Sequence, residues 1–431
     1  MNKKRAIINN VMYVFLCVAI SIAVGTLLMI LVYCLPTNRI KENILHSVYI
    51  YSTENDSYDW ATNKAGARLD NFTDALMMNI ASYQGSGNAV KDAMNNTYVS
   101  YPGKTQTASL FTAGIFGYMD GSVLVDYSRY WHGYLVWLKP AMMVMNKGDI
   151  RILNMYLQFF LTAIVLMELY KKQRYKIVIP FSMAILTINP VSTVMCMQYS
   201  SIYLITMVAA LILIKMNLYN SEKYWHLFLW IGISTAFFDF LTYPIVGLGI
   251  NLILLIILGN KDLRRNMLEI VISSFAWGIG YAGMWAGKWI VASILTGQNV
   301  IGKAIEMVAY RSFGDSTEEA FVDSSSAFNV VLYNLDQALK TPVVWVVAVF
   351  LVIILFMILF GKMDIKVNKP VIIALAVIAI FPIGWYCIIK NHSAIHSWMT
   401  YRNLSITVFS LALMLSCSIA PREKKGERQD S

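Results

Sequence analysis

Long uncharged stretches separated by short charged clusters dominate the chain. Residues 6–38 and 177–214 carry no charge, and residues 224–260 carry only Asp239. A membrane-spanning helix needs about 20 predominantly apolar residues, so the first stretch predicts one span. The other two are long enough for two spans each. Both contain a break near the middle, at Asn189-Pro190 and at residues 239–244, where a tight turn is expected.

Shorter apolar runs raise the predicted number of spans to about ten. These runs are residues 150–170, 267–293, 341–361, 370–389 and 403–421. The pattern therefore predicts an all-α polytopic membrane protein. Its predicted organisation is a first span in 1–35, a long outer loop with interfacial helices in 36–149, spans two to seven in 150–295, a second outer loop in 296–340, spans eight to ten in 341–421 and a tail in 422–431.

The distribution of basic residues predicts the orientation. Lys and Arg outnumber Asp and Glu in the start MNKKR, in the loops YKKQRYK, KMNLYNSEK, GNKDLRR and GKMDIKVNK, and in the C-terminal PREKKGERQDS. The two long segments carry no basic excess. Basic residues favour the cytoplasmic side, so both termini are expected there, in a multi-pass protein of the cell membrane. The uncharged run after MNKKR is too long for a signal peptide and lacks a small-residue cleavage pattern, so it is expected to be a retained span.

Composition narrows the functional classes. The chain is 57% hydrophobic and 14% charged, which argues against a soluble protein. The net charge of +10 lies where anionic inner-leaflet lipids would attract it, so membrane lipids rather than nucleic acid are the expected partners. Five widely spaced cysteines predict neither a disulfide framework nor a metal knuckle. No phosphate loop, dinucleotide fingerprint or nucleophile elbow occurs, so no cofactor is predicted and no motif supports a divalent cation.

Two carboxylates lie close together in the first predicted outer loop. Asp70 and Asp74 are four residues apart in LDNFTDALMMNIA. On a helix this spacing places both on one face, where repulsion between like charges raises one pKa and favours a general base. The alternative is that these acids only stabilise a helix N-terminus. Both interpretations stay open on the sequence alone.

Further polar residues are predicted at the same membrane level. The segment YSRYWHGYLVWLKP is too short and too aromatic to span, which favours an interfacial helix. Its Arg129 and His132 share a helical face, where they could bind a phosphate or only extend toward water. Asp239 lies at the predicted outer bend of residues 224–260, and an ionisable group so close to hydrocarbon is costly unless it is paired or functional.

Lys288 follows a stripe of Gly280, Gly283 and Gly287. Small residues at this spacing favour close helix approach. The lysine is expected near the outer end of its span, where it could extend toward water or bind an anionic headgroup.

The last predicted outer turn, KNHSAIHSWMTYR, contains Lys390, His392, His396 and Arg402. HSAIH has the histidine spacing of a zinc helix but lacks the adjacent Glu and a third ligand, so no metal site is predicted. The histidines are instead expected in a cationic phosphate-binding cluster or as protonatable partners of Asp239.

This layout resembles the GT-C superfamily of integral membrane glycosyltransferases. The resemblance rests on about ten spans, an acidic helix in the first outer loop (TDALM), an interfacial aromatic helix (RYWHGYLVWLKP) and outer basic turns (GKW and NHSAIH). It implies that Asp74 or Asp70 is the catalytic base, that a polyprenyl phosphate carries the donor sugar, and that a glycan or lipid-linked molecule is the acceptor. The leaving phosphate would be held by Lys288, Arg402 and His392 or His396. The sequence departs from the family pattern because its acids lie well past the first span without an adjacent second acid.

Three other classes are compatible with parts of the pattern. An O-antigen-type polysaccharide polymerase or ligase would also use outer arginines and histidines. A polysaccharide or lipid transporter would distribute polar residues through the membrane depth, and a structural membrane subunit would need none of them. The gathering of acids and cations at one predicted face favours an enzyme with an extracytoplasmic active site.

Overall fold

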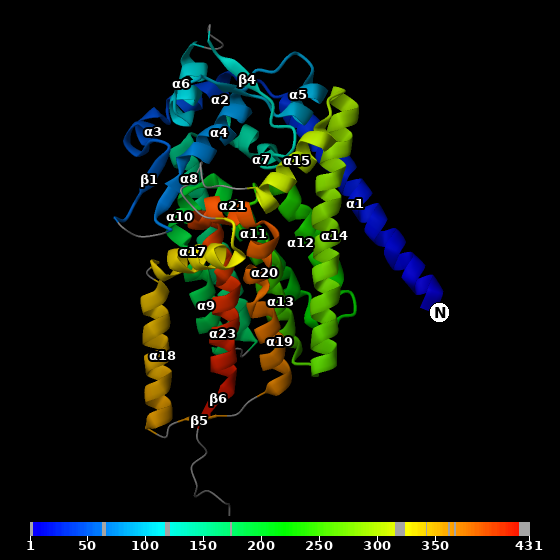
Figure 1. The fold of residues 1–431 in the computed structure, drawn as a ribbon, viewed down its shortest axis with the longest axis vertical. Coiled ribbons are helices and arrows are strands. Elements are labelled where there is room, and N and C mark those ends of the chain that lie inside the picture. Colours follow the sequence, from blue (N-terminus) through cyan, green and yellow to red (C-terminus); the bar gives the residue numbers. More distant parts are fainter. Residues whose placement is uncertain are drawn as a thin grey trace, which may run out of the picture.

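The computed structural model describes residues 3–62, 66–116, 121–172, 175–314, 324–341, 343–360, 363–365 and 368–421. Within these ranges helices dominate, and the strands form three short two-stranded ribbons. Figure 1 shows two parts: a bundle of long helices, and above it an upper layer of short helices and ribbons built from residues 34–146. The predicted all-α class agrees with this architecture.

The upper layer corresponds to the predicted long outer loop. Its helices are α2 (Asn38–Leu45), α3 (Val48–Glu54), α4 (Asn71–Ser82), α5 (Ala89–Asn95), α6 (Gln106–Phe116) and α7 (Leu135–Met142). Its ribbons pair β1 (Ser57–Asp59) with β2 (Arg68–Asp70), and β3 (Tyr98–Ser100) with β4 (Val123–Val125). Local caps set the helix starts: side chains of Asp70 and Asn88 accept backbone N–H groups of α4 and α5, as helix N-caps do. The interfacial aromatic segment is helical only from Leu135.

The bundle contains the predicted apolar runs. Its helices are α1 (Lys3–Tyr33), α8 (Lys147–Lys171), α9 (Tyr175–Ile188), α10 (Pro190–Met195), α11 (Met197–Lys215), α12 (Tyr224–Phe238), α13 (Val246–Gly259), α14 (Leu263–Thr296), α18 (Val343–Leu359), α19 (Lys369–Ala379), α20 (Phe381–Ile388) and α23 (Ser405–Ser418). The connecting elements are α15 (Val300–Phe313), α17 (Ala327–Leu339), α21 (Lys390–Ile395), α22 (Ser397–Thr400), the 3₁₀ turns η1 (Leu218–Asn220) and η2 (Tyr401–Leu404), and the ribbon of β5 (Met363–Ile365) with β6 (Ile419–Pro421).

The prediction of about ten spans is corrected by the helix lengths. In the described ranges, five helical segments are long and apolar enough to cross a membrane: most of α1, then α8, α11, α14 and the continuous range of α19 and α20. Helices α9, α12 and α13 have only 14 or 15 residues, or about 22 Å at 1.5 Å per residue. This is less than the roughly 30 Å of hydrocarbon in a bilayer. The break at Asn189-Pro190 therefore leaves α9 shorter than a full span while α11 remains long enough, and the break around Asp239 divides the second run into two pieces, α12 and α13, that are both shorter than full spans.

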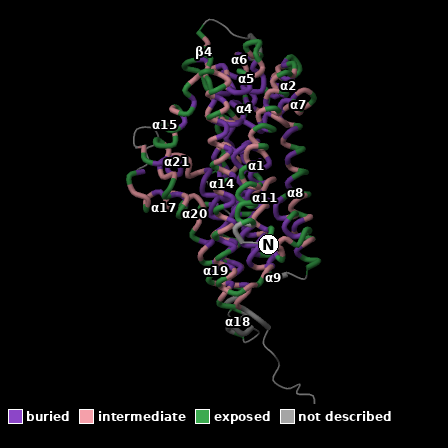
Figure 2. The backbone as a smooth tube through the Cα atoms, turned by 90° about the vertical axis from the view of Figure 1, so that its right-hand side faces the viewer, coloured by how far each residue is buried: buried purple, intermediate pink, exposed green. Residues whose placement is uncertain are grey.

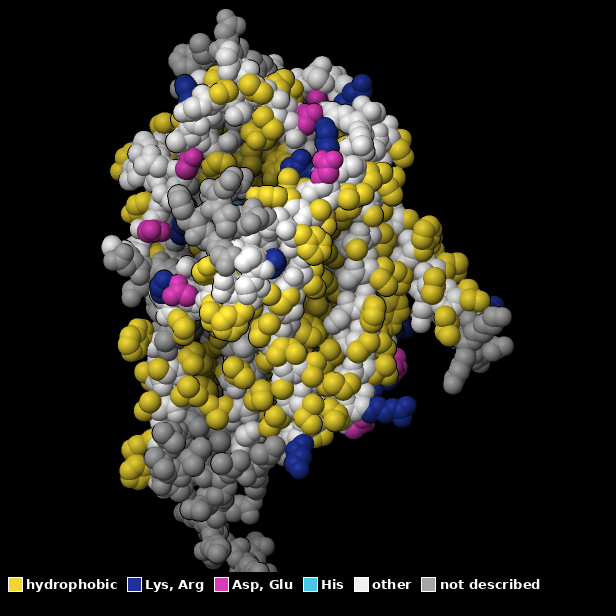
Figure 3. Space-filling view, viewed as in Figure 1, with side chains coloured by type: hydrophobic (Ala, Val, Ile, Leu, Met, Phe, Trp, Pro, Cys, Tyr) yellow, Lys and Arg dark blue, Asp and Glu magenta, His cyan; other side chains and the backbone are white. Residues whose placement is uncertain are grey.

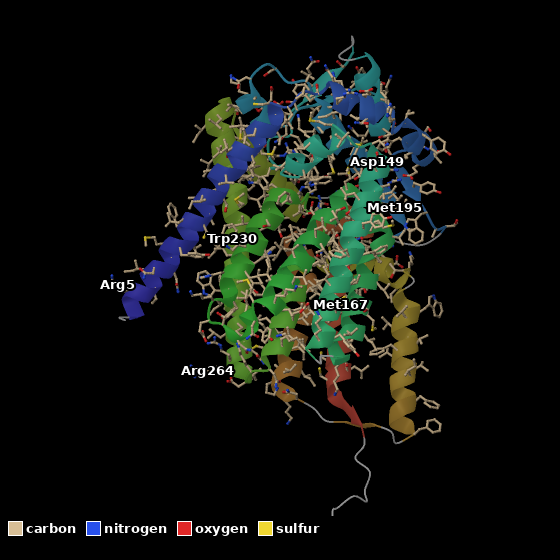
Figure 4. All side chains as sticks on the ribbon, turned by 180° about the vertical axis from the view of Figure 1, so that it is seen from behind. Arg5, Asp149, Met167, Met195, Trp230 and Arg264 are labelled. Carbon is tan, nitrogen blue, oxygen red and sulfur yellow. The ribbon has the colours of Figure 1, made fainter. Side chains whose placement is uncertain are left out.

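Segments predicted to share one side of the membrane lie at one end of the bundle. Their contacts are Lys215–Glu168 at 3.8 Å, Arg265–Glu222 at 2.6 Å, Asn368–Asn260 at 3.0 Å and the pairing of β5 with β6. Figure 4 shows Arg5 and Arg264 toward this lower end and Asp149 toward the opposite, upper end. The charge-based grouping of the short loops thus agrees with their positions.

The outer surface of the bundle is apolar. Helices α1, α8, α14 and α18 expose large side chains such as Phe15, Phe160, Phe275 and Trp345. In Figure 3, Lys, Arg, Asp and Glu side chains gather toward the two ends and leave an apolar band between them. Figure 2 shows that burial is concentrated inside the bundle and within the upper layer. An apolar surface of this kind is typical of helices that contact lipid.

The predicted glycine stripe allows close packing of α14. A Cβ at Gly280 would overlap the carbonyl oxygen of Leu229 on α12, and a Cβ at Gly283 would lie 2.9 Å from a methyl carbon of Val18 on α1. Gly287 faces Ile22 of α1 in the same way. The prediction that these glycines permit close helix approach is therefore confirmed.

Candidate functional site

A cavity of about 970 Å³ lies between the upper layer and the upper ends of the bundle helices. We call it the main cavity. Its acidic side chains are Asp56, Asp59 and Asp70, and its lysine and arginine side chains are Arg68, Arg311 and Lys340. Of the ten predicted site residues, Asp70, His392 and His396 line it. They come from the start of α4 and from the turn that contains α21, which the fold brings together.

The short helices help to create this cavity. Helix α12 ends at Phe238 and α11 begins at Met197, and the nearby side chains of Phe240 and Gln198 line the cavity. Helix α14 continues to Thr296. The second break therefore contributes Phe240 to the cavity wall, and the start of α11, which follows the first break, contributes Gln198.

Asp70 is the most buried carboxylate on the cavity wall, with 8% of its surface exposed. Its Oδ1 accepts the backbone N–H of Thr73 at 3.1 Å, and its Oδ2 accepts the Thr73 hydroxyl at 2.7 Å and the side-chain amide of Gln198. Burial raises the pKa of Asp70, the charge of Asp74 adds to this effect, and the hydrogen bonds from Thr73 and Gln198 oppose it. A carboxylate with a raised pKa is a better proton acceptor than an ordinary aspartate.

Asp74 lies outside the main cavity and is not exposed to solvent. Its carboxylate is 3.3 Å from Nζ of Lys147 and accepts the backbone N–H of Met197 at 3.0 Å. It therefore pairs with the start of α8 and caps α11. The expected shared helical face does not form, because α4 begins at Asn71 and Asp70 is its N-cap.

His392 and His396 line the main cavity but do not supply its positive charge. Burial lowers the pKa of His392 well below its usual range and that of His396 to about 3, and the charge of Arg311 adds to both effects. Arg311 donates to Nδ1 of His392, so the proton is on Nε2, which donates to the carbonyl oxygen of Leu241 at 2.9 Å. The cationic cluster expected at this turn is therefore centred on Arg311, and the neutral His392 ring orients it.

Two smaller cavities adjoin the main one at Arg311. The apolar groove, of about 430 Å³, lies between α14 and α15 and is lined by aromatic and aliphatic side chains, including Trp285, Trp289 and Val308. The second, of about 440 Å³, contains Arg129 and Arg311 together with both histidines. Arg311 lines all three cavities, and Arg129 lines the two smaller ones. We call this pair the arginine junction.

The arginine junction has unused hydrogen-bond donors. The Nε atoms of Arg129 and Arg311 are buried and have no hydrogen-bond partner among the residues that the structure describes. The guanidinium carbons lie 5.6 Å and 5.9 Å from the ring centres of Tyr127 and Tyr130. A guanidinium offers several donors in a planar array that matches phosphate oxygens. Two such groups at the polar end of an apolar groove make a suitable place for the phosphate of a lipid.

Two predicted residues hold turns of the chain outside the cavities. His132 has a positive φ of 55°, its Nε2–H donates to the carbonyl oxygen of Tyr127 at 3.1 Å, and burial lowers its pKa to about 3. Asp239 accepts the backbone N–H of Thr242 at 2.9 Å and the Thr242 hydroxyl, and burial raises its pKa to about 6. Both side chains therefore serve local backbone conformation.

Three predicted cations also bind backbone carbonyls. Lys288 is buried, and its Nζ donates to the carbonyl oxygen of Met94 at 2.9 Å, at the end of α5. Arg402 is buried, and its Nε donates to the carbonyl oxygen of Ile188 at 2.9 Å, at the end of α9. Lys390 donates to a carbonyl of the loop before α17. Cations near the carbonyl end of a helix are stabilising, and these contacts place all three outside the described cavities.

Several residues that line these cavities are not among the predicted site residues. Asp56 and Asp59 belong to the segment NDSYDW, and two acids so close together in the first predicted outer loop could have indicated a polar site. Arg311 lies in the second predicted outer loop without a motif around it, and Gln198 is one polar residue within an apolar run. In the part of the chain that the structure describes, no group of three or more His, Cys, Asp and Glu side chains is arranged to hold a metal ion.

These cavities place a buried carboxylate, two arginines and an apolar groove next to one another. In comparisons with protein-family models, with curated proteins and with solved structures, nothing matches this chain.

Proposed function

We propose that this protein is a membrane glycosyltransferase that transfers a sugar from a polyprenyl-phosphate donor to a glycan or lipid-linked acceptor. The observation that carries the proposal is the position of Arg311, which borders both the apolar groove and the cavity that contains Asp70. A donor with an apolar chain, a phosphate and a sugar requires these three environments in that order.

The donor fits the cavities by chemistry. The isoprenoid chain would lie in the apolar groove against Trp285 and Trp289, and its phosphate would accept hydrogen bonds from Arg129 and Arg311. The sugar would then enter the main cavity, whose volume of about 970 Å³ is at the upper end of the range for small-molecule sites. The polar wall near Arg68 and Lys340 leaves room for an acceptor.

The reaction needs a base and a stabilised leaving group. Asp70 takes the proton of an acceptor hydroxyl as its oxygen bonds to the anomeric carbon. The bond between that carbon and the phosphate oxygen breaks, and the released polyprenyl phosphate keeps the electron pair. Its added negative charge is stabilised by Arg129 and Arg311 at the low-dielectric edge of the groove. The neutral ring of His392 keeps Arg311 directed to this point.

The positions of the basic loops support an orientation. The short basic loops lie at the lower end of the bundle, and the upper layer with the main cavity lies at the other. By the positive-inside tendency, the lower end and both termini would be cytoplasmic. The active site would then be on the extracytoplasmic side of the cell membrane.

Binding of the donor can be tested without knowing the sugar. We expect farnesyl phosphate to raise the thermal midpoint of the purified full-length protein more than farnesol or inorganic phosphate does, because only farnesyl phosphate contacts both the groove and the arginines. The variant Arg129→Gln/Arg311→Gln should lose this difference. Arg68→Gln, which changes a main-cavity residue outside the arginine junction, is the matched control. Equal stabilisation by farnesol and farnesyl phosphate would contradict the donor assignment.

Transfer itself can be tested in cells. Lipid-linked and surface glycans are compared in cells without the gene and in cells complemented with the wild type, Asp70→Asn or Glu42→Gln. We expect the null cells to lack one glycan and Asp70→Asn not to restore it. The control variant Glu42→Gln replaces an exposed carboxylate of α2 that lines none of the three cavities, so it should restore the glycan. Unchanged glycans in the null cells would refute the proposed activity. Full restoration by Asp70→Asn would refute the role of Asp70 and favour a polymerase or ligase that depends on Arg311.

A further inference from the structure

The first turn of α11 contacts both acids of the LDNFTDALMMNIA segment. The backbone N–H groups of Met197 and Gln198 donate to the carboxylate of Asp74, at 3.0 Å and 3.4 Å to Oδ1. The side-chain amide of Gln198 donates to Oδ2 of Asp70. Gln198 is therefore held to α4 at two points, one through its backbone and one through its side chain.

Asp74 fixes the backbone at the start of α11. The residue before α11, Cys196, provides no side-chain cap, so the carboxylate of Asp74 supplies the missing acceptors and interacts favourably with the helix dipole. Asp74 is itself fixed by Lys147, whose Nζ also donates to Oδ1 of Asn71 at 2.6 Å. All of these residues are buried. The start of α11 thus has one defined position relative to α4.

The carboxylate of Asp70 accepts three hydrogen bonds from described residues. An ionised carboxylate has about four acceptor positions, two on each oxygen. Oδ2 accepts the Thr73 hydroxyl and the Gln198 amide, and Oδ1 accepts the Thr73 backbone N–H. Within the described residues one acceptor position on Oδ1 therefore remains, on a carboxylate that lines the main cavity.

We infer that Gln198 is a positioning residue whose side-chain amide occupies Oδ2 of Asp70 and leaves Oδ1 to accept a proton from a hydroxyl group in the main cavity. The catalytic role of this contact rests on the proposed function, whereas the hydrogen bond between Gln198 and Asp70 is present in the structure. Asp74, which four-residue spacing suggested as a second candidate base, acts here as the anchor of the helix end that carries Gln198.

The pKa of Asp70 depends on the hydrogen bond from Gln198. Titratable groups that influence Asp70 or are influenced by it are Asp74 on α4 and Cys196 and Tyr199 around the start of α11. Arg68 and Arg311 line the same cavity. The Gln198 amide stabilises the charged carboxylate, so its removal raises the pKa of Asp70 further. None of the other groups changes when only the side chain of Gln198 is replaced.

Carbodiimide labelling tests the inference on the detergent-solubilised full-length protein. Dicyclohexylcarbodiimide reacts with protonated carboxyl groups, and mass spectrometry measures labelling of Asp70 as a function of pH. For Gln198→Leu we expect the labelling midpoint to move to higher pH by about one unit, as loss of a hydrogen bond to a charged group implies. Gln337→Leu, which changes another cavity glutamine with no hydrogen bond to Asp70, should leave the midpoint unchanged. A midpoint that is equal in Gln198→Leu and the wild type would overturn the inference.

A second variant covers the case in which Gln198→Leu does not fold. Gln198→Glu has nearly the same shape, keeps the backbone contact with Asp74 and places two carboxyl groups together, so a larger shift to higher pH is expected. No shift in this variant also overturns the inference. Failure of the proposed function gives a different result, because the null cells would then keep their glycans, or Asp70→Asn would restore them, while the labelling shift in Gln198→Leu persists.

Discussion

Replacing each acid of the pair by asparagine should separate a structural carboxylate from a reactive one. Asp74→Asn removes the charge that compensates buried Lys147, 3.3 Å away, where neither side chain is exposed to solvent. Asp70→Asn removes a carboxylate for which no ion pair is found in the described ranges and whose hydrogen bonds an amide oxygen can partly replace. We therefore expect Asp74→Asn to lower the stability of the fold strongly and Asp70→Asn to lower it little.

The expected size of the effect follows from the geometry. Two unit charges at 3.3 Å attract by about 5 kcal/mol at an effective dielectric constant of about 20. Removing one partner of a buried pair typically costs about 3–5 kcal/mol because the other charge stays buried. The contact of Lys147 with Asn71 and with the ring of Tyr51, 4.0 Å away, offsets a part of this loss. A cost of about 3 kcal/mol is a large share of the stability of an ordinary domain.

The assay is thermal unfolding of the detergent-solubilised variants, with protein yield as a second readout. Asp74→Asn should lower the thermal midpoint by several degrees more than Asp70→Asn. Combining Asp74→Asn with Lys147→Met should recover part of the loss, because the unpaired buried charge is gone. Equal midpoints for the two single variants, or no recovery in the double variant, would refute the assignment of Asp74 as a structural anchor.

Three further predictions concern residues outside the arginine junction. Gly280→Ala should destabilise the protein by about 1–3 kcal/mol, because the new methyl group overlaps the carbonyl of Leu229. The control Gly278→Ala places a methyl group that meets no atom within 4 Å, so it should not lower the thermal midpoint. Asp239→Asn should stabilise the protein above about pH 6 by up to about 3 kcal/mol and lose this advantage as the pH falls toward 4. The reason is that the raised pKa of Asp239, about 6 against an ordinary 3.8, makes the folded state lose stability as pH rises through this range; thermal midpoints at several pH values check it. Lys288→Met should lower the midpoint but keep the stabilisation by farnesyl phosphate, because Lys288 donates to the end of α5, lies over the ring of Trp131 and does not line the apolar groove.

Local patterns predicted the parts of the fold that depend on short distances along the chain. The uncharged runs gave the apolar helices, and the stripe Gly280, Gly283 and Gly287 gave the tight packing of α14. Basic loops were grouped correctly at one end. Helix lengths were overestimated where Asn189-Pro190 and Asp239 end helices early, since charge gaps show where a span could lie but not where its hydrogen bonding stops.

Much of the candidate site depends on contacts that a single sequence does not encode locally. Gln198 meets Asp70 across 128 positions, and Arg311 meets His392 across 81. The spacing of Asp70 and Asp74 predicted two acids on one helical face, but α4 starts at Asn71, so Asp70 is its N-cap and only Asp74 lies within the helix. Arg402 and Lys288 were predicted to bind a phosphate, and in the structure they donate to backbone carbonyls at helix ends.

The early ends of α9 and α12 have an energetic consequence for an isoprenoid substrate. Pulling a single five-carbon unit out of hydrocarbon into water would cost on the order of 4 kcal/mol. Helix α9 ends at Ile188 and α12 at Phe238, whereas α14 continues to Thr296, and the apolar groove along α14 meets the main cavity at Arg311. A donor of the proposed kind could therefore present its head group for reaction while its chain remains dissolved in the bilayer, and no extraction work would be added to the barrier.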